Sequence, residues 1–191
     1  MTDINEITQR LKAALGQKRY QHSLGVADTA KAMAEAFGAD QDRAYLAGLV
    51  HDCAKYLTFD ESLKLFEKYN RTPDTESVLC PPVLHAPLGA VLAKEVYGIT
   101  DSDVLSAIAR HTVADEGMTL LDKIIYIADM AEPHRDFDGV DEIRKYYMTD
   151  IDAAYAVTLR LSLMHNISQG KRVHPNTLKA WNEILLTEEK L

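Results

Sequence analysis

The stretch Gly48-Leu49-Val50-His51-Asp52-Cys53-Ala54-Lys55 is the one around which the chain is organised, because His51 and Asp52 stand side by side directly after an apolar run. Adjacent helical residues point about 100° apart, so these two can converge on one ion only where their helix faces a cavity. Asp52 and Lys55 are three residues apart and share a helix face. On its own, the stretch is better explained as an ordinary helix with a buried histidine and a surface Asp-Lys pair. Matching partners elsewhere in the chain overturn that interpretation.

Composition and charge indicate a globular chain that does not bind nucleic acid. The 191 residues are 47% hydrophobic and 26% charged, which are ordinary values and suit a single domain spanning 1–191. The net charge of -8 argues against broad electrostatic capture of DNA, RNA or anionic lipid. It leaves room for a small anionic substrate, because a few local cations can reverse the sign inside one pocket.

The cysteines and the N-terminal segment favour a cytoplasmic protein. Cys53 and Cys80 have no metal-type spacing and form no disulfide framework, which fits a reducing compartment. Residues 1–6 lack the basic and apolar regions of a signal peptide, and no apolar run approaches the length of a membrane span. We therefore expect a cytoplasmic location and no membrane partner.

Helix start and stop signals divide the chain into helices and leave little for strands. We expect an all-α fold, a compact single-domain helical bundle in which a metal-site core at about 18–135 carries C-terminal helices at about 140–187. The proline-rich segment 70–82 is expected to be a connection without a helix, long enough to cover a pocket. The expected helices run at about 4–15, 18–37, 40–52, 58–69, 85–97, 101–111, 119–129, 140–147, 151–168 and 175–186.

Histidines and aspartates recur near the expected helix ends in the order His22, His51-Asp52, Asp129. Imidazole nitrogen and carboxylate oxygen together suit a divalent transition metal such as iron, manganese, cobalt or zinc. Water completes such a coordination shell, and a polarised water is what a hydrolase needs. His85 and His111 lie between the pair and Asp129, so Asp52 could bridge a second ion, giving one or two per chain. A single histidine is better explained as an ordinary core or surface residue; the ordered set favours the metal site.

A phosphorylated substrate also requires cationic groups near the metal. Lys55 lies on the face of Asp52, and Arg135 follows Asp129 closely, with a guanidinium fork that matches phosphate oxygens. We therefore expect Asp52, Lys55 and Arg135 to be catalytic. The candidates for substrate contact are Arg19, Lys55, His111, Thr112, His134 and Arg135, although an exposed surface role is equally consistent for Arg19 and is the better explanation of His134.

Three segments carry a family resemblance: Lys18-Arg19-Tyr20-Gln21-His22-Ser23-Leu24-Gly25-Val26, Leu49 to Lys55, and Asp122-Lys123-Ile124-Ile125-Tyr126-Ile127-Ala128-Asp129-Met130-Ala131-Glu132-Pro133-His134-Arg135. They resemble the HD-domain metal-dependent phosphohydrolases and, more narrowly, the bacterial YqeK-type symmetrical bis(5'-nucleosyl)-tetraphosphatases. The resemblance implies hydrolysis of diadenosine tetraphosphate at its centre to two ADP, with an iron-type site at His22, His51, Asp52 and Asp129. Family members often have glycine where this chain has Ala114, which leaves the local loop shape open.

Other functions remain open at this stage. One is an HD phosphohydrolase acting on nucleoside mono- or triphosphates or on guanosine alarmones, and another is a non-catalytic nucleotide-sensing module. The partner expected in each case is a small nucleotide. A homodimer formed through an apolar stripe on the last two helices and burial of that stripe within one chain are both consistent with the sequence. Nothing in the sequence identifies the pocket for the base.

Overall fold

The computed structural model describes residues 4–188; residues 1–3, on which the signal-peptide expectation partly rests, and residues 189–191 lie outside it. Within the described range every regular element is a helix, which confirms the all-α prediction. None of these helices is long and apolar enough to cross a bilayer. The elements are α1 (Ile4–Ala14), α2 (Gln17–Phe37), α3 (Gln41–Val50), α4 (Phe59–Lys68), α5 (Thr75–Leu79), η1 (Pro81–Val83), α6 (His85–Glu95), α7 (Ser102–Arg110), α8 (Leu120–Ala131), α9 (Val140–Arg144), α10 (Ile151–Ser168) and α11 (Pro175–Glu188).

A capping side chain satisfies free backbone N–H groups at the starts of α3, α4, α5, α7, α8 and α10. Thr58 with Glu61 and Thr119 with Asp122 form complete capping boxes at the starts of α4 and α8. A side-chain cap of this kind contributes about 1 kcal/mol. At the C-terminal end of α2, Gly38 adopts a φ of 71°, a left-handed conformation that closes the helix with little steric cost. These local signals explain why most helix boundaries are readable from the sequence.

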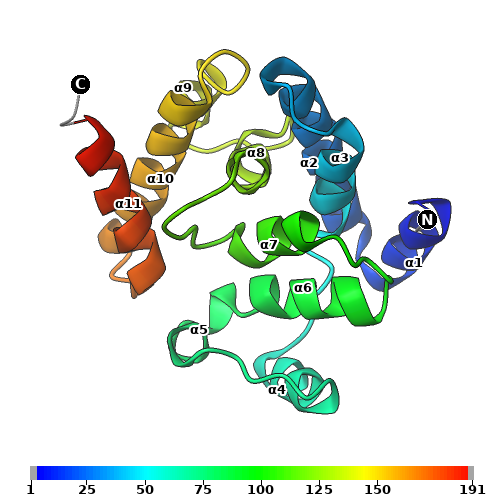
Figure 1. Cartoon of the computed structure of the whole chain (residues 1–191). Coiled ribbons are helices and arrows are strands. Elements are labelled where there is room, and N and C mark those ends of the chain that lie inside the picture. The colour runs from blue at the N-terminus through cyan, green and yellow to red at the C-terminus, as the bar shows by residue number, and fades with distance from the viewer. Residues whose placement is uncertain (1–3, 189–191) are drawn as a thin grey trace.

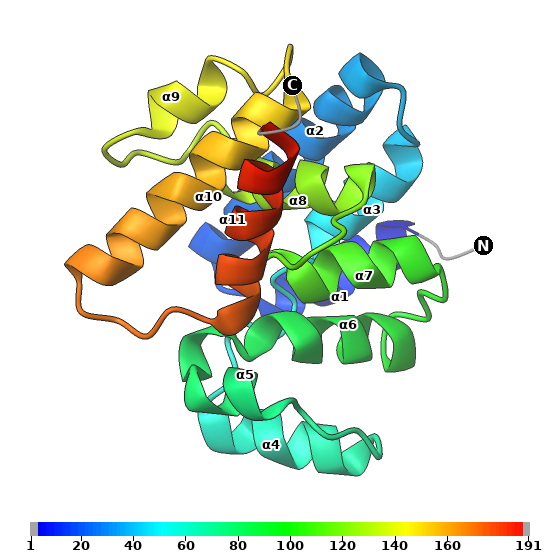
Figure 2. The same cartoon turned by 60° about the vertical axis from the view of Figure 1, so that its left-hand side comes forward.

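The central helix is α8, whose core-facing positions are fully buried. Figure 1 shows it between the α2–α3 pair on one side and α10 with α11 on the other, with α6 and α7 below. The α2–α3 contact is the most extensive pairing of helices, and it depends on Gly48, where an added Cβ would lie 2.8 Å from the Ala27 Cα. In Figure 2, α4 and α5 lie at the lower end of the molecule and α10 and α11 lie side by side.

Several expected boundaries differ from the structure. The helix expected over 40–52 ends at Val50, so His51 and Asp52 lie in the turn after it, and the helix expected over 85–97 ends at Glu95. Segment 70–82 is not a bare connection: it contains α5, capped by the Asp74 side chain, and η1, which begins at Pro81 because proline suits a first helical turn. The helix expected over 140–147 ends at Arg144. The α8 helix continues two residues past Asp129, so this carboxylate lies inside its last turn.

The loop after α7 also bears on the family resemblance. Ala114 has a φ of 57°, the left-handed conformation that favours glycine, and its side chain is fully buried. The backbone therefore takes a shape that a glycine would adopt easily, although the residue is alanine.

Candidate metal centre

Five helix ends bring the predicted ligands together. His22 lies in the second turn of α2, His51 is the residue after α3, His85 opens α6, His111 is the residue after α7, and Asp129 lies in the last turn of α8. Asp52 follows His51 in the turn beyond α3, so the two are not constrained to neighbouring positions of a regular helix. The four histidines and Asp52 are buried, and the side chain of Asp129 is 15% exposed.

Each histidine is oriented by a hydrogen bond from its Nδ1. In His51, His85 and His111 the acceptor is the backbone carbonyl three residues earlier, at 2.6, 2.8 and 2.7 Å. A carbonyl oxygen can only accept, so Nδ1 carries the proton and, in the neutral ring, Nε2 carries the lone pair. In His22 the partner of Nδ1 is the Glu132 carboxylate at 3.0 Å. All four Nε2 atoms therefore face the centre, which is the arrangement of metal-binding histidines.

The Asp52 carboxylate divides the histidines into two pairs. Its Oδ2 lies 3.4 Å from Nε2 of His51 and 3.8 Å from Nε2 of His22. Its Oδ1 lies 3.2 Å from Nε2 of His85 and 3.5 Å from Nε2 of His111. The predicted ligands are thus arranged around one bridging carboxylate, with one histidine pair on each oxygen.

A second carboxylate, that of Asp129, lies beside the pair formed by His22 and His51. Asp129 Oδ1 lies 2.9 Å from Nε2 of His22 and 3.8 Å from Nε2 of His51. The donor atoms of His22, His51 and Asp129 all lie within 4.8 Å of one another. His51 Nε2 is buried and has no hydrogen-bond partner among the described residues, an arrangement that a cation would satisfy.

The second pair has close ring nitrogens. Nε2 of His85 and Nε2 of His111 are 3.1 Å apart. Burial, together with the nearby His111 ring and Lys55 ammonium, lowers the pKa of His85 to about 4, so this ring is neutral at pH 7. The lone pair on Nε2 of His85 then faces His111 and Asp52, and a positive charge beside it stabilises this arrangement. Lys55 Nζ lies 3.1 Å from the same nitrogen and supplies positive charge there. The donor set on this side also fits a divalent ion.

Both carboxylates are ionised. Burial alone would raise the pKa of Asp52, but the facing imidazoles, His51 first, hold it well below its usual range. Burial would likewise raise the pKa of Asp129, but the close contact with His22 and the nearby Arg135 charge lower it instead. The two carboxylates therefore concentrate negative charge between the four histidine side chains, as a cation site requires.

Two guanidinium groups stand on the outer side of these carboxylates. Arg19 Nη1 donates to Asp52 Oδ2 at 2.7 Å. Arg135 Nε donates to the Asp129 carbonyl at 2.6 Å, and its Nη2 donates to Asp129 Oδ1. Both arginines line a large open cavity of about 1200 Å³, hereafter the arginine cavity. The other residues lining it are Gly16, Gln17, Lys18, Gln21, His22, Glu132, His134, Asp136 and Phe137.

Two further predicted contacts occupy different surroundings. His134 is 68% exposed at its side chain and lines the arginine cavity, with its Nδ1 3.0 Å from Glu132 Oε2. Thr112 does not line the arginine cavity, and its buried hydroxyl has no hydrogen-bond partner among the described residues.

The sequence-based reasoning missed Glu132, a carboxylate only 1% exposed. Its Oε1 faces His22, and its Oε2 accepts a hydrogen bond of 2.7 Å from the backbone N–H of His134. Burial alone would raise the pKa of Glu132, and the hydrogen bonds from His22 and His134 lower it instead. The one available signal was its position three residues after Asp129, within the third segment that carries the family resemblance.

Comparisons with known proteins agree over nearly the whole chain. Residues 19–133 match the HD domain family model. The chain is 38% identical to the symmetrical bis(5'-nucleosyl)-tetraphosphatase of Halalkalibacterium halodurans over 95% of this chain and 96% of that protein. It is 38% identical to the protein of the same name from Bacillus subtilis, over 90% and 92% of the two chains. A crystal structure from Clostridium acetobutylicum, described as a predicted HD superfamily hydrolase involved in NAD metabolism, shares 41% identity and a TM-score of 0.93, covering 98% of this chain and 99% of that one. The chain belongs to the HD domain family, alongside the symmetrical bis(5'-nucleosyl)-tetraphosphatases.

Proposed function

We propose that this chain is a metal-dependent hydrolase that cleaves diadenosine tetraphosphate at its centre to give two ADP. The observation that carries the proposal is the Asp52 carboxylate, whose two oxygens each face a separate pair of histidine nitrogens. The names of the relatives from Halalkalibacterium halodurans and Bacillus subtilis support this substrate. Residues 1–191 act as one HD domain in this proposal, and the ADP-forming reaction consumes one water.

The expected metal is iron, with one or two ions per chain, and the donor set offers two groups of ligands. His22, His51, Asp129 and Asp52 Oδ2 would hold one, and His85, His111 and Asp52 Oδ1 would hold the other. Nitrogen and carboxylate donors of this kind also accept manganese, cobalt or zinc. When bound, such a pair of divalent ions activates water and offsets charge on a phosphoryl group.

The residues of the chain itself then bind and orient the tetraphosphate. Arg19 and Arg135 border the arginine cavity beside the two carboxylates, and we expect their guanidinium groups to contact phosphate oxygens. Lys55 adds a positive charge on the opposite side, next to His85. Burial lowers the pKa of Lys55, although the Asp52 and Asp129 carboxylates act in the opposite direction.

The bond that breaks joins the second and third phosphorus atoms through their bridging oxygen. The water oxygen bonds to one phosphorus, the bridging oxygen leaves with the other half, and each product is ADP. Charge accumulates on the departing oxygen, and the cationic side chains Lys55 and Arg135 stabilise it electrostatically.

The test is anaerobic purification with metal analysis, followed by chromatography of products from a nucleotide panel. We expect one or two transition-metal ions per chain and ADP as the only product from diadenosine tetraphosphate. Asp52→Ala should lose both metal and turnover. Formation of ATP with AMP would contradict central cleavage, and turnover of a different nucleotide alone would assign another substrate to the same centre.

A further inference from the structure

A second cavity borders the metal centre at His85, whose Nε2 faces Asp52 Oδ1. It has a volume of about 190 Å³ and is hereafter the Phe59 cavity. The arginine cavity includes His22, which faces Asp52 Oδ2, whereas the Phe59 cavity includes His85, which faces Asp52 Oδ1. The residues lining the Phe59 cavity are Lys55, Leu57, Phe59, Ser62, Pro81, Pro82, Leu84 and His85.

We propose that the Phe59 cavity binds the second adenine of the dinucleotide, stacked on the Phe59 ring, while the first nucleoside occupies the arginine cavity. The inference rests on the proposed function. A substrate cut at its centre has two identical halves, and both must extend away from the bond that breaks. Cavities at opposite ends of the Asp52 carboxylate give the two halves separate paths.

The chemistry of the Phe59 cavity suits a base next to phosphate. Lys55 Nζ lies 3.1 Å from His85 Nε2, so the cation lies at the end of the cavity nearest the centre. Phe59, Pro81 and Pro82 supply apolar surface to the same cavity. Aromatic rings bind bases by stacking without requiring a particular base, because every base has a π-face.

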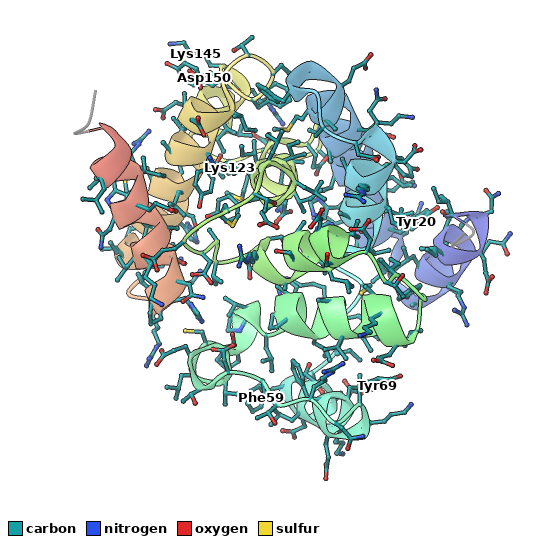
Figure 3. The ribbon with its side chains drawn as sticks, in the orientation of Figure 1. Tyr20, Phe59, Tyr69, Lys123, Lys145 and Asp150 are labelled. Carbon is teal, nitrogen blue, oxygen red and sulfur yellow. The ribbon has the colours of Figure 1, made fainter. Side chains whose placement is uncertain are left out.

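The structure also explains why Phe59 is held at the surface. It is the first residue of α4, directly after the N-cap Thr58 of the Thr58–Glu61 capping box, and it is 37% exposed. Figure 3 shows it on α4, below α6. Another part of the cavity lining is η1, where Pro81 and Pro82 fix the backbone. Capping and proline geometry thus hold an exposed ring and a rigid apolar surface facing one cavity.

The size of the cavity limits what it can hold. A volume of about 190 Å³ is below the range of about 300 Å³ or more that encloses a whole drug-sized ligand. The Phe59 cavity therefore encloses the base and leaves the ribose at its mouth. The arginine cavity is larger, at about 1200 Å³, and its lining also includes Gln17, Gln21 and Phe137. It has room for the base, ribose and phosphates of the other half of the dinucleotide.

The test compares Phe59→Ala with Leu120→Ala. Leu120 is a close structural match, because it is also the first residue of a helix after a capping-box threonine and is also 37% exposed. Steady-state rates are measured with diadenosine tetraphosphate, and adenosine 5'-tetraphosphate, which lacks the second nucleoside, is measured as a competitive inhibitor. Phe59→Tyr retains a stacking ring, and melting curves check that each variant folds.

We expect Phe59→Ala to raise KM for the dinucleotide about 5- to 150-fold, the range for loss of one base–aromatic stack. The inhibition constant of adenosine 5'-tetraphosphate should stay unchanged, Phe59→Tyr should restore KM, and Leu120→Ala should behave as wild type. An unchanged KM in Phe59→Ala, or equal rises in KM and in the inhibition constant, would overturn the second base site while the hydrolase itself stands. Absence of ADP formation by the wild type would overturn the proposed function and, with it, this site.

Discussion

The Nδ1 atom of His22 lies 3.0 Å from the Oε1 atom of Glu132, across 110 residues of chain. Glu132 is in turn held by its own loop, because the His134 backbone N–H donates to its other oxygen and Arg144 Nη2 donates to its carbonyl. A carboxylate at this position fixes the ring orientation of His22 and makes its Nε2 a stronger donor. The relationship joins α2 to the end of α8, the two elements that supply one side of the centre.

Replacing Glu132 should weaken the metal site without removing a direct ligand. We expect Glu132→Ala to lower metal affinity about 10- to 100-fold, the usual effect of removing such a supporting partner. The metal affinity of Glu132→Gln should lie between those of the wild type and Glu132→Ala, because the amide oxygen can accept from only one of the two N–H groups that face this side chain. Chelator competition measures the affinity. Asp138→Ala, at an exposed carboxylate of the same loop, is the control; wild-type affinity in Glu132→Ala would contradict the role.

Gly25 offers an independent test of the same relationship. An added Cβ would lie 2.5 Å from Glu132 Oε2, so Gly25→Ala must displace that carboxylate. We expect reduced metal affinity in a folded protein, measured by chelator competition beside a thermal melt. Gly48→Ala is the contrasting variant. Its Cβ would meet backbone atoms of Ala27, which cannot rotate away, so it should cost about 1–3 kcal/mol of stability. Equal metal binding in Gly25→Ala and wild type would show that Glu132 tolerates displacement.

Because the two oxygens of Asp52 face separate pairs of histidines, we expect loss of one pair to remove one ion and loss of Asp52 to remove both. Wild-type protein should retain two ions per chain after dialysis, His111→Ala should retain one, and Asp52→Ala should retain none. Metal analysis by mass spectrometry measures each value. Chelation should also lower the melting temperature, because ions that bind only the folded state stabilise it. Two ions in His111→Ala would place the second site elsewhere.

Arg135 should resist replacement by lysine. Its Nε and Nη2 donate to the carbonyl and the side chain of Asp129 at once, and a single ammonium cannot reproduce that fork. We expect Arg135→Lys to lower kcat/KM for diadenosine tetraphosphate about 10- to 100-fold, as for loss of a hydrogen bond to a charged group. Arg160→Lys alters a surface pair with Glu142 and should change neither turnover nor stability appreciably. Full activity in Arg135→Lys would contradict this role and show that only the positive charge of Arg135 is needed.

Local sequence was sufficient for the all-helical class and for most helix boundaries. Thr58, Thr119 and Gly38 act on backbone groups within one turn of themselves, so their effect is visible without knowledge of the rest of the chain. The same holds for the order of His22, His51-Asp52 and Asp129, which names the donors of a metal site. The short helix α5 was missed because prolines on both sides of it resemble those of an open loop.

Only the tertiary structure decided how these groups meet. Sequence order does not indicate that Asp52 turns one oxygen to His22 and the other to His85, nor that Glu132 supports His22 across 110 residues. It gives no sign of the cavity between Phe59 and the prolines of η1. The physical reason is that capping, periodicity and residue chemistry are local properties, whereas these contacts depend on how helix ends far apart in the chain pack around α8.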